Sequence, residues 1–217
     1  MLDRKFKKAV IMLLKDNGER VIPEKMDITN ELLIEHLARY HFSVPHIYGR
    51  TLDFATGVGY GAHVIAKKCK HELEEIIGVD INSNAIQYAK ANYYHPLSDF
   101  KVADVTDPTL PDQLGAFDVI LSFETIEHIE DEDQFMDNIY HLLKPGGTLI
   151  LSTPFGEGKG KPCGSPFHVH QMTETEFVSM FDQFQKKKFF YQKGALIEPM
   201  EGSQMEHKPL GIVIAYK

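Results

Sequence analysis

Three aspartates lie at or near the ends of three short apolar segments, and together they could form one binding site. Asp53 lies in the first segment, Asp80 ends the second and Asp104 follows the third. A carboxylate at the end of a parallel strand can accept hydrogen bonds from both hydroxyls of a ribose. Asp53 would repel a pyrophosphate and attract a cationic amine, and Asp104 could accept from an adenine amino group. The three carboxylates favour a nucleoside that carries a positive charge.

A glycine-rich turn follows Asp53 and reads Ala55-Thr-Gly57-Val-Gly59-Tyr-Gly61. Glycines let a ligand approach the backbone closely and permit positive φ. The same turn also satisfies the dinucleotide-binding pattern, because Ala62 stands at its third small-residue position. A nucleotide (NAD)-dependent oxidoreductase therefore remains an alternative.

A second cluster reads Glu124-Thr-Ile-Glu127-His128, which places two carboxylates and an imidazole within five residues. With His168 as a further ligand, these side chains could hold a divalent cation such as Mg²⁺. Without a metal, His128 and Glu127 could take the proton of an acceptor group. A purely structural role for the histidine is the third interpretation, and the sequence leaves all three open.

The elements that must position these residues follow from the hydrophobic pattern. Short apolar strands alternate with amphipathic helices, which predicts an α/β fold with a doubly wound, Rossmann-like, mostly parallel sheet of seven strands and an antiparallel last strand. Strands are expected near 51–55, 76–79, 100–103, 117–122, 147–152, 188–193 and 210–216. Helices are expected near 27–42, 61–69, 83–93, 131–143 and 173–184, the last of which starts with the capping-box spacing of Thr173 and Glu176.

The chain is interpreted as residues 1–44, a helical N-terminal extension covering the ligand site, and residues 45–217, the main domain. Within the extension, the apolar spacing between Leu2 and Leu14 predicts a helix that covers the domain or attaches to a membrane surface. Residues 153–171, here called the lid segment, contain several glycines and prolines and two lysines. A long loop at the ligand end of the sheet is typical of a substrate lid.

Composition narrows the class of protein. The chain has 217 residues, 43% of them apolar and 25% charged, with a net charge of −8. Nucleic-acid binding is not expected from this charge. Two cysteines indicate a reducing compartment, and the apolar run 9–14 is too short to cross a bilayer. We expect a cytoplasmic enzyme, and the sequence leaves its oligomeric state open.

The motifs in their order resemble class I S-adenosylmethionine-dependent methyltransferases. The resemblance covers residues 51–152 and rests on the glycine turn, Gly-Val-Asp80, Ala-Asp104-Val, Phe117-Asp-Val-Ile-Leu-Ser and Leu143-Lys-Pro-Gly-Gly-Thr-Leu. One departure is Ala55, where the family usually has a glycine and where alanine is expected to fit with negative φ. The acid–histidine cluster is similar to that of metal-dependent O-methyltransferases.

The resemblance implies that S-adenosylmethionine is the cofactor, with its methionine portion at the glycine turn, its ribose at Asp80 and its adenine at Asp104 and Val105. Residues 18–24 and 35–40 look like those of a bacterial subgroup whose members often act on sugars or other small metabolites. In that subgroup Arg39 and Tyr40 would close over the methionine end, although Tyr40 also suits a core position. The expected cofactor contacts are Arg39, Tyr40, Asp53, Ala55, Thr56, Gly57, Gly59, Asp80, Ile81, Asp104, Val105, Phe123 and Glu124.

The predicted function is methylation of a small metabolite, at oxygen rather than nitrogen, with Glu127 and His128 as the catalytic residues. The expected metal ligands, if a metal is used, are Glu124, Glu127, His128 and His168. The alternatives are the oxidoreductase named above and a subunit that binds the cofactor without turning it over.

Overall fold

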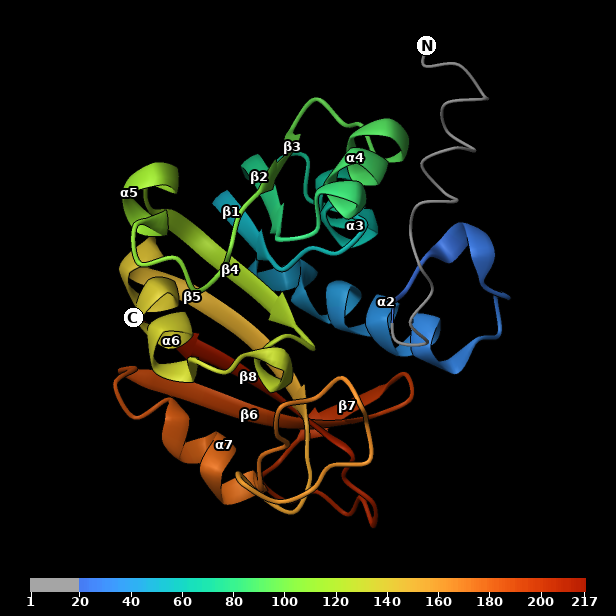
Figure 1. The fold of residues 1–217 in the computed structure, drawn as a ribbon, viewed down its shortest axis with the longest axis vertical. Coiled ribbons are helices and arrows are strands. Elements are labelled where there is room, and N and C mark those ends of the chain that lie inside the picture. Colours follow the sequence, from blue (N-terminus) through green and yellow to red (C-terminus); the bar gives the residue numbers. More distant parts are fainter. Residues whose placement is uncertain (1–19) are drawn as a thin grey trace. The chain divides into compact units, whose positions relative to one another are not determined.

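The structure, a computed structural model, describes residues 20–217 (Figure 1), and these form two compact units, the first ending at Val105 and the second spanning Thr106–Lys217. The helix expected between Leu2 and Leu14 lies outside the described residues. Within residues 20–217, no helix has the length and apolar character needed to cross a membrane. The division into an extension of residues 1–44 and a domain of residues 45–217 stays a prediction.

The first unit alternates strands with helices, as the hydrophobic pattern predicts. Its three strands are parallel neighbours in the order β3-β2-β1. Helices α3 and α4 pack against β2 and β3, and α2 packs against α3. The elements are η1 (Pro23–Lys25), α2 (Glu31–Ser43), η2 (Val44–His46), β1 (Gly49–Phe54), α3 (Tyr60–Lys68), β2 (Leu73–Asp80), α4 (Ser83–Asn92) and β3 (Ser98–Val102).

The second unit orders its strands β4-β5-β8-β6-β7. Strand β5 is parallel to β4, and β8 is antiparallel to both β5 and β6. Its elements are α5 (Leu110–Leu114), β4 (Phe117–Phe123), η3 (Ile126–His128), α6 (Glu132–Leu142), β5 (Leu143–Pro154), α7 (Glu174–Met180), β6 (Lys186–Lys193), β7 (Leu196–Pro199) and β8 (Leu210–Tyr216).

The fold is α/β and Rossmann-like, as predicted, and the antiparallel last strand is confirmed. The described residues contain eight strands, so the prediction of seven is wrong. The extra strand, β7, has only four residues and pairs with the edge of β6. It was missed because so short a segment, between a glycine and a proline-containing loop, carries no clear alternation of apolar residues.

Side-chain caps begin the helices that lead away from the strand ends. The Asn82 side chain accepts hydrogen bonds from two backbone N–H groups at the start of α4. Thr173 and Glu176 form both halves of a capping box, which confirms that prediction. Helix α7 nevertheless ends at Met180, earlier than expected.

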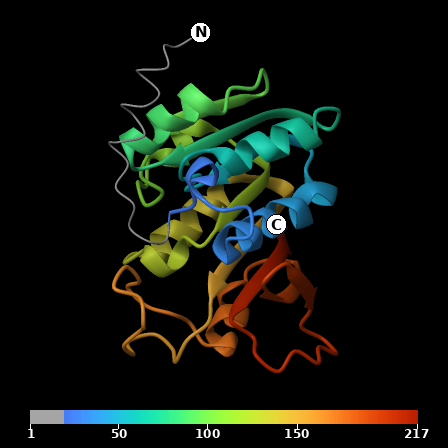
Figure 2. The same cartoon turned by 90° about the vertical axis from the view of Figure 1, so that its right-hand side faces the viewer.

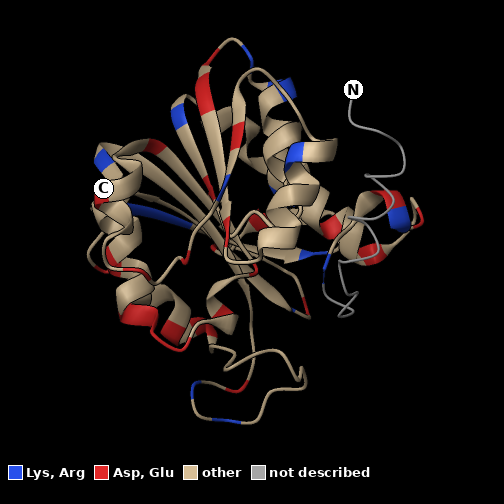
Figure 3. Cartoon of the chain, turned by 45° about the horizontal axis from the view of Figure 1, so that its top comes forward, with Lys and Arg blue, Asp and Glu red and all other residues tan. Residues whose placement is uncertain are grey.

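The lid segment is a long excursion beyond β5, orange in Figure 2, whose two ends are joined. Phe155 and Met172 form a parallel bridge, and the Gly156 N–H donates to the Met172 carbonyl at 2.9 Å. Lysine and arginine residues are spread among acidic residues over many elements, with one run of three lysines at the start of β6 (Figure 3).

Candidate functional site

The ends of β1 and β2 bring together Asp53, Asp80 and the glycine turn, all within the first unit. The Gly57 N–H donates to Asp80 Oδ2 at 2.9 Å, and the Asn82 N–H donates to Oδ1 at 2.8 Å. Burial raises the pKa of Asp80, while these two N–H groups and Arg20 oppose the rise. The carboxylate is thus held in a fixed orientation by backbone donors. Each oxygen keeps acceptor capacity for a further donor such as a ribose hydroxyl.

Room for a ligand is present at Gly57. Its φ is +59°, and a Cβ built there would meet no atom within 4 Å. Next to Asp80, the side chain of Ile81 is 68% exposed and offers an apolar surface to a purine. Asp104 is exposed and Val105 is buried. A partly exposed, oriented carboxylate, an open backbone turn and an exposed apolar side chain fit a nucleoside cofactor.

Ala55 departs from its prediction. Negative φ was predicted at this position, but φ is +67°. A left-handed conformation costs a residue with a Cβ roughly 1–2 kcal/mol, because the Cβ approaches the following carbonyl oxygen. The turn therefore keeps the backbone shape that glycine would give, and alanine carries the strain.

Asp53 is buried, with 1% of its surface exposed. Thr56 Oγ1 donates to Oδ2 at 2.5 Å, and the Tyr40 hydroxyl lies 3.2 and 3.3 Å from the two carboxylate oxygens. Burial raises the pKa of Asp53 to about 6, although the hydrogen bonds from Thr56 and Tyr40 lower it. The Asp53 carboxylate is therefore hydrogen-bonded within the protein, and it holds Thr56 and Tyr40 at the glycine turn.

Helix α2 places the Tyr40 ring next to the glycine turn. A Cβ at Gly61 would lie 1.8 Å from Tyr40 Cζ, so only glycine leaves room for the Tyr40 ring. The Tyr60 hydroxyl lies 2.9 Å from His36 Nδ1, and burial lowers the pKa of His36 well below its usual value, so the ring is neutral near pH 7. Tyr40 and Arg39 are both buried, and the core position considered for Tyr40 is confirmed.

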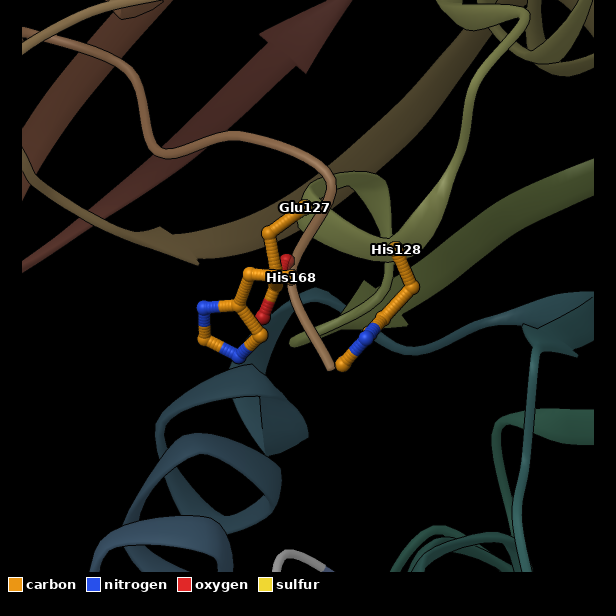
Figure 4. Close-up of side chains that lie close together, drawn as sticks. All are labelled: Glu127, His128 and His168. Atoms are coloured by element: carbon orange, nitrogen blue, oxygen red, sulfur yellow. The ribbon is translucent and has the colours of Figure 1, made fainter. Parts of the chain in front are cut away.

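The acid–histidine cluster lies in the second unit. Strand β4 ends at Phe123, which is buried, and η3 then carries Glu127 and His128. The potential ligand atoms of Glu127, His128 and His168 all lie within 4.8 Å of one another. Figure 4 shows these side chains projecting in the same direction from η3 and from the lid segment. Three of the four residues named as metal ligands are thus brought together.

Glu124, the fourth residue, is not a member of that group. Its backbone has φ +49°, and its Oε1 accepts a hydrogen bond from Ser152 Oγ at 2.7 Å. The sequence grouped Glu124 with Glu127 and His128 because two carboxylates and an imidazole lie within five residues. The left-handed backbone at Glu124 precedes the η3 turn, and the Glu124 side chain contacts Ser152 instead.

Neighbouring groups orient each member of the cluster. Thr153 Oγ1 donates to the buried Glu127 carboxylate at 3.1 Å. His128 Nδ1 lies 2.9 Å from the Phe167 carbonyl, which can only accept, so Nδ1 carries the hydrogen and Nε2 keeps its lone pair. Gln171 Nε2 lies 3.1 Å from His168 Nδ1, so Nδ1 accepts and Nε2 of His168 carries the hydrogen.

Residues 52–151 match the family model described as "Methyltransferase domain". A protein of Mycolicibacterium smegmatis named "Probable S-adenosylmethionine-dependent methyltransferase" is 30% identical over 170 residues, which are 76% of this chain and 62% of that protein. The chain thus spans about three fifths of that relative's length. Phosphoethanolamine N-methyltransferase 1 of Zea mays is 35% identical over 115 residues, 52% of this chain and 22% of that protein.

The fold also occurs in solved structures. A SAM-dependent methyltransferase from Archaeoglobus fulgidus superposes with a TM-score of 0.63 at 16% identity, covering 87% of this chain and 95% of that one.

Proposed function

We propose that this chain, whose residues 52–151 match the model of a methyltransferase domain, is an S-adenosylmethionine-dependent enzyme that methylates a hydroxyl group of a small molecule. The observation that carries the proposal is the Asp80 carboxylate, oriented by the Gly57 and Asn82 N–H groups beside an open backbone turn. In this proposal Asp80 accepts from the ribose hydroxyls. Ile81 covers the adenine and Asp104 accepts from its amino group.

The choice of cofactor follows from the charges. Asp53 and Asp80 both lie at this end of the first unit, where a diphosphate would meet two carboxylates and a sulfonium with its α-amino group would be attracted. When bound, S-adenosylmethionine supplies an electrophilic methyl group: the O–C bond forms as the C–S bond breaks, and S-adenosylhomocysteine leaves.

The proton of the acceptor hydroxyl passes to His128 Nε2 in this proposal. The hydrogen bond from Nδ1 to the Phe167 carbonyl fixes the tautomer whose Nε2 can accept it. The buried Glu127 carboxylate, one oxygen of which lies within 4.8 Å of one ring nitrogen of each histidine, stabilises the imidazolium that results. His168 Nε2–H can donate to the acceptor oxygen.

A divalent cation held by Glu127, His128 and His168 is the second candidate, supported by the convergence of their ligand atoms. The Gln171 amide argues against it, because the present hydrogen bond leaves the hydrogen on Nε2 of His168. Ligation through that nitrogen requires the Gln171 amide to turn over, so we favour the metal-free base.

The proposal is tested by calorimetric binding of S-adenosylhomocysteine and NAD⁺ to the full chain, followed by turnover of methyl-labelled S-adenosylmethionine with matched alcohols and amines. We expect S-adenosylhomocysteine to bind, NAD⁺ not to bind, and label to appear on the alcohols. Binding of NAD⁺ alone would favour the oxidoreductase. Label on amines only would move the reaction to nitrogen, as in the relative from Zea mays.

A further inference from the structure

Two apolar side chains on either side of His168 are exposed. Phe167 is 46% exposed and Val169 is 50% exposed, although large apolar residues among those described are mostly buried. Covering such side chains stabilises a complex by roughly 25 cal/mol per Å² of apolar surface. Exposed apolar surface beside polar groups that could react is typical of a ligand-binding site.

These two residues are tied to the acid–histidine cluster through their backbones. The Val169 N–H donates to the Glu127 carbonyl at 2.8 Å, and His128 Nδ1 donates to the Phe167 carbonyl at 2.9 Å. The lid segment around them is also held, since the Phe167 N–H donates to Ser165 Oγ at 3.2 Å. The side chains are therefore exposed at backbone positions fixed against η3.

We propose that the methyl acceptor is amphipathic, with its hydroxyl at Glu127 and His128 and a hydrocarbon or aromatic portion against Phe167 and Val169. This inference rests on the proposed function and adds the class of substrate. The His128 and His168 rings, which lie next to Phe167 and Val169 in the chain or by hydrogen bond, pack edge to face with centroids 4.9 Å apart. A fully polar acceptor would gain nothing from burying Phe167 and Val169.

The test uses phenol, 4-propylphenol and 4-heptylphenol as probes, with binding to the full chain measured by calorimetry with and without S-adenosylhomocysteine. We expect affinity to rise about twofold per methylene, because one side of the alkyl chain would contact protein. The double variant Phe167→Ser/Val169→Ser should remove most of this rise. Leu196→Ser, which alters a residue that is 58% exposed on β7, is the matched control and should leave the series unchanged.

The outcomes separate the two proposals. If S-adenosylhomocysteine binds but affinity does not depend on alkyl length, or the double variant keeps that dependence, the amphipathic acceptor is excluded and the proposed function stands. If S-adenosylhomocysteine does not bind, both fall. Binding of the full chain to phosphatidylcholine vesicles that the double variant abolishes would also overturn the inference, because the two side chains would then contact a lipid surface.

Discussion

The hydroxyl of Tyr40 in α2 donates a hydrogen bond to the carboxylate of Asp53 in β1, at 3.2 and 3.3 Å from its two oxygens. Both groups are buried. The contact fixes the helix that precedes the sheet to the strand that leads into the glycine turn. Tyr40 is thus a core residue and a polar partner of the proposed cofactor site at once.

The Tyr40–Asp53 pair predicts a specific pH dependence. Because the pKa of Asp53 is raised to about 6 in the folded protein, the folded state holds this proton more tightly than the unfolded state. The contribution of Asp53 to the free energy of unfolding therefore falls as pH rises from about 4 through 6. Tyr40→Phe removes a donor that favours the carboxylate, so this pKa should rise further. We expect the variant to lose about 1–2 kcal/mol at pH 8 and less at pH 5, measured by urea unfolding.

Tyr60→Phe is the control for Tyr40→Phe. The Tyr60 hydroxyl lies 2.9 Å from Nδ1 of His36, whose pKa is well below its usual value. Loss of this hydroxyl should therefore lower the free energy of unfolding by nearly the same amount at both pH values. Equal losses at pH 5 and pH 8 in the Tyr40 variant would show that Asp53 does not titrate in this range.

Asp80→Asn tests the ribose assignment. The substitution keeps the shape of the side chain and removes the charge that strengthens its hydrogen bonds, so S-adenosylhomocysteine should bind at least about tenfold more weakly. Calorimetry measures this directly. Asp99→Asn, at an exposed aspartate of β3, should bind as the unaltered protein does. An unchanged affinity in the Asp80 variant would remove this residue from the site.

Ala55→Gly should stabilise the fold. It relieves the left-handed strain at φ +67°, roughly 1–2 kcal/mol, and gives back roughly 0.5–1 kcal/mol through the greater freedom of glycine in the unfolded chain. The net gain of about 0.5–1 kcal/mol corresponds to an increase in Tm of about 1–4 °C, measured by calorimetry. Ala91 lies in α4 and does not have positive φ. Ala91→Gly should therefore lower Tm. A lower Tm for both variants would contradict the strain at Ala55.

His128→Gln should reduce turnover by about a hundredfold or more, because general-base catalysis contributes roughly that much, while S-adenosylhomocysteine affinity stays the same. Activity of the unaltered protein should persist in excess chelator. Gln171→Ala, which changes only the partner of His168, should have a small effect on turnover. If activity disappears with chelator and returns with Mg²⁺, the metal site is favoured over the metal-free base.

The sequence by itself determined the order of strands and helices, because apolar periodicity and capping residues act locally. It also placed Asp80 and the glycine turn at strand ends, and the parallel pairing of β1 with β2 brings these ends together at the proposed cofactor site. The short strand β7 was not predicted, because four residues at a sheet edge show too weak an alternation of apolar residues.

Only the tertiary structure decided the sign of the backbone angle φ at Ala55 and which residues belong to the acid–histidine cluster. Spacing along the chain grouped Glu124 with Glu127, but a left-handed residue turned Glu124 toward Ser152. The tautomers of His128 and His168 depend on a carbonyl and an amide of the lid segment, about forty residues away in sequence for His128. Such contacts arise from chain folding over long separations, and no local pattern of residue types records them.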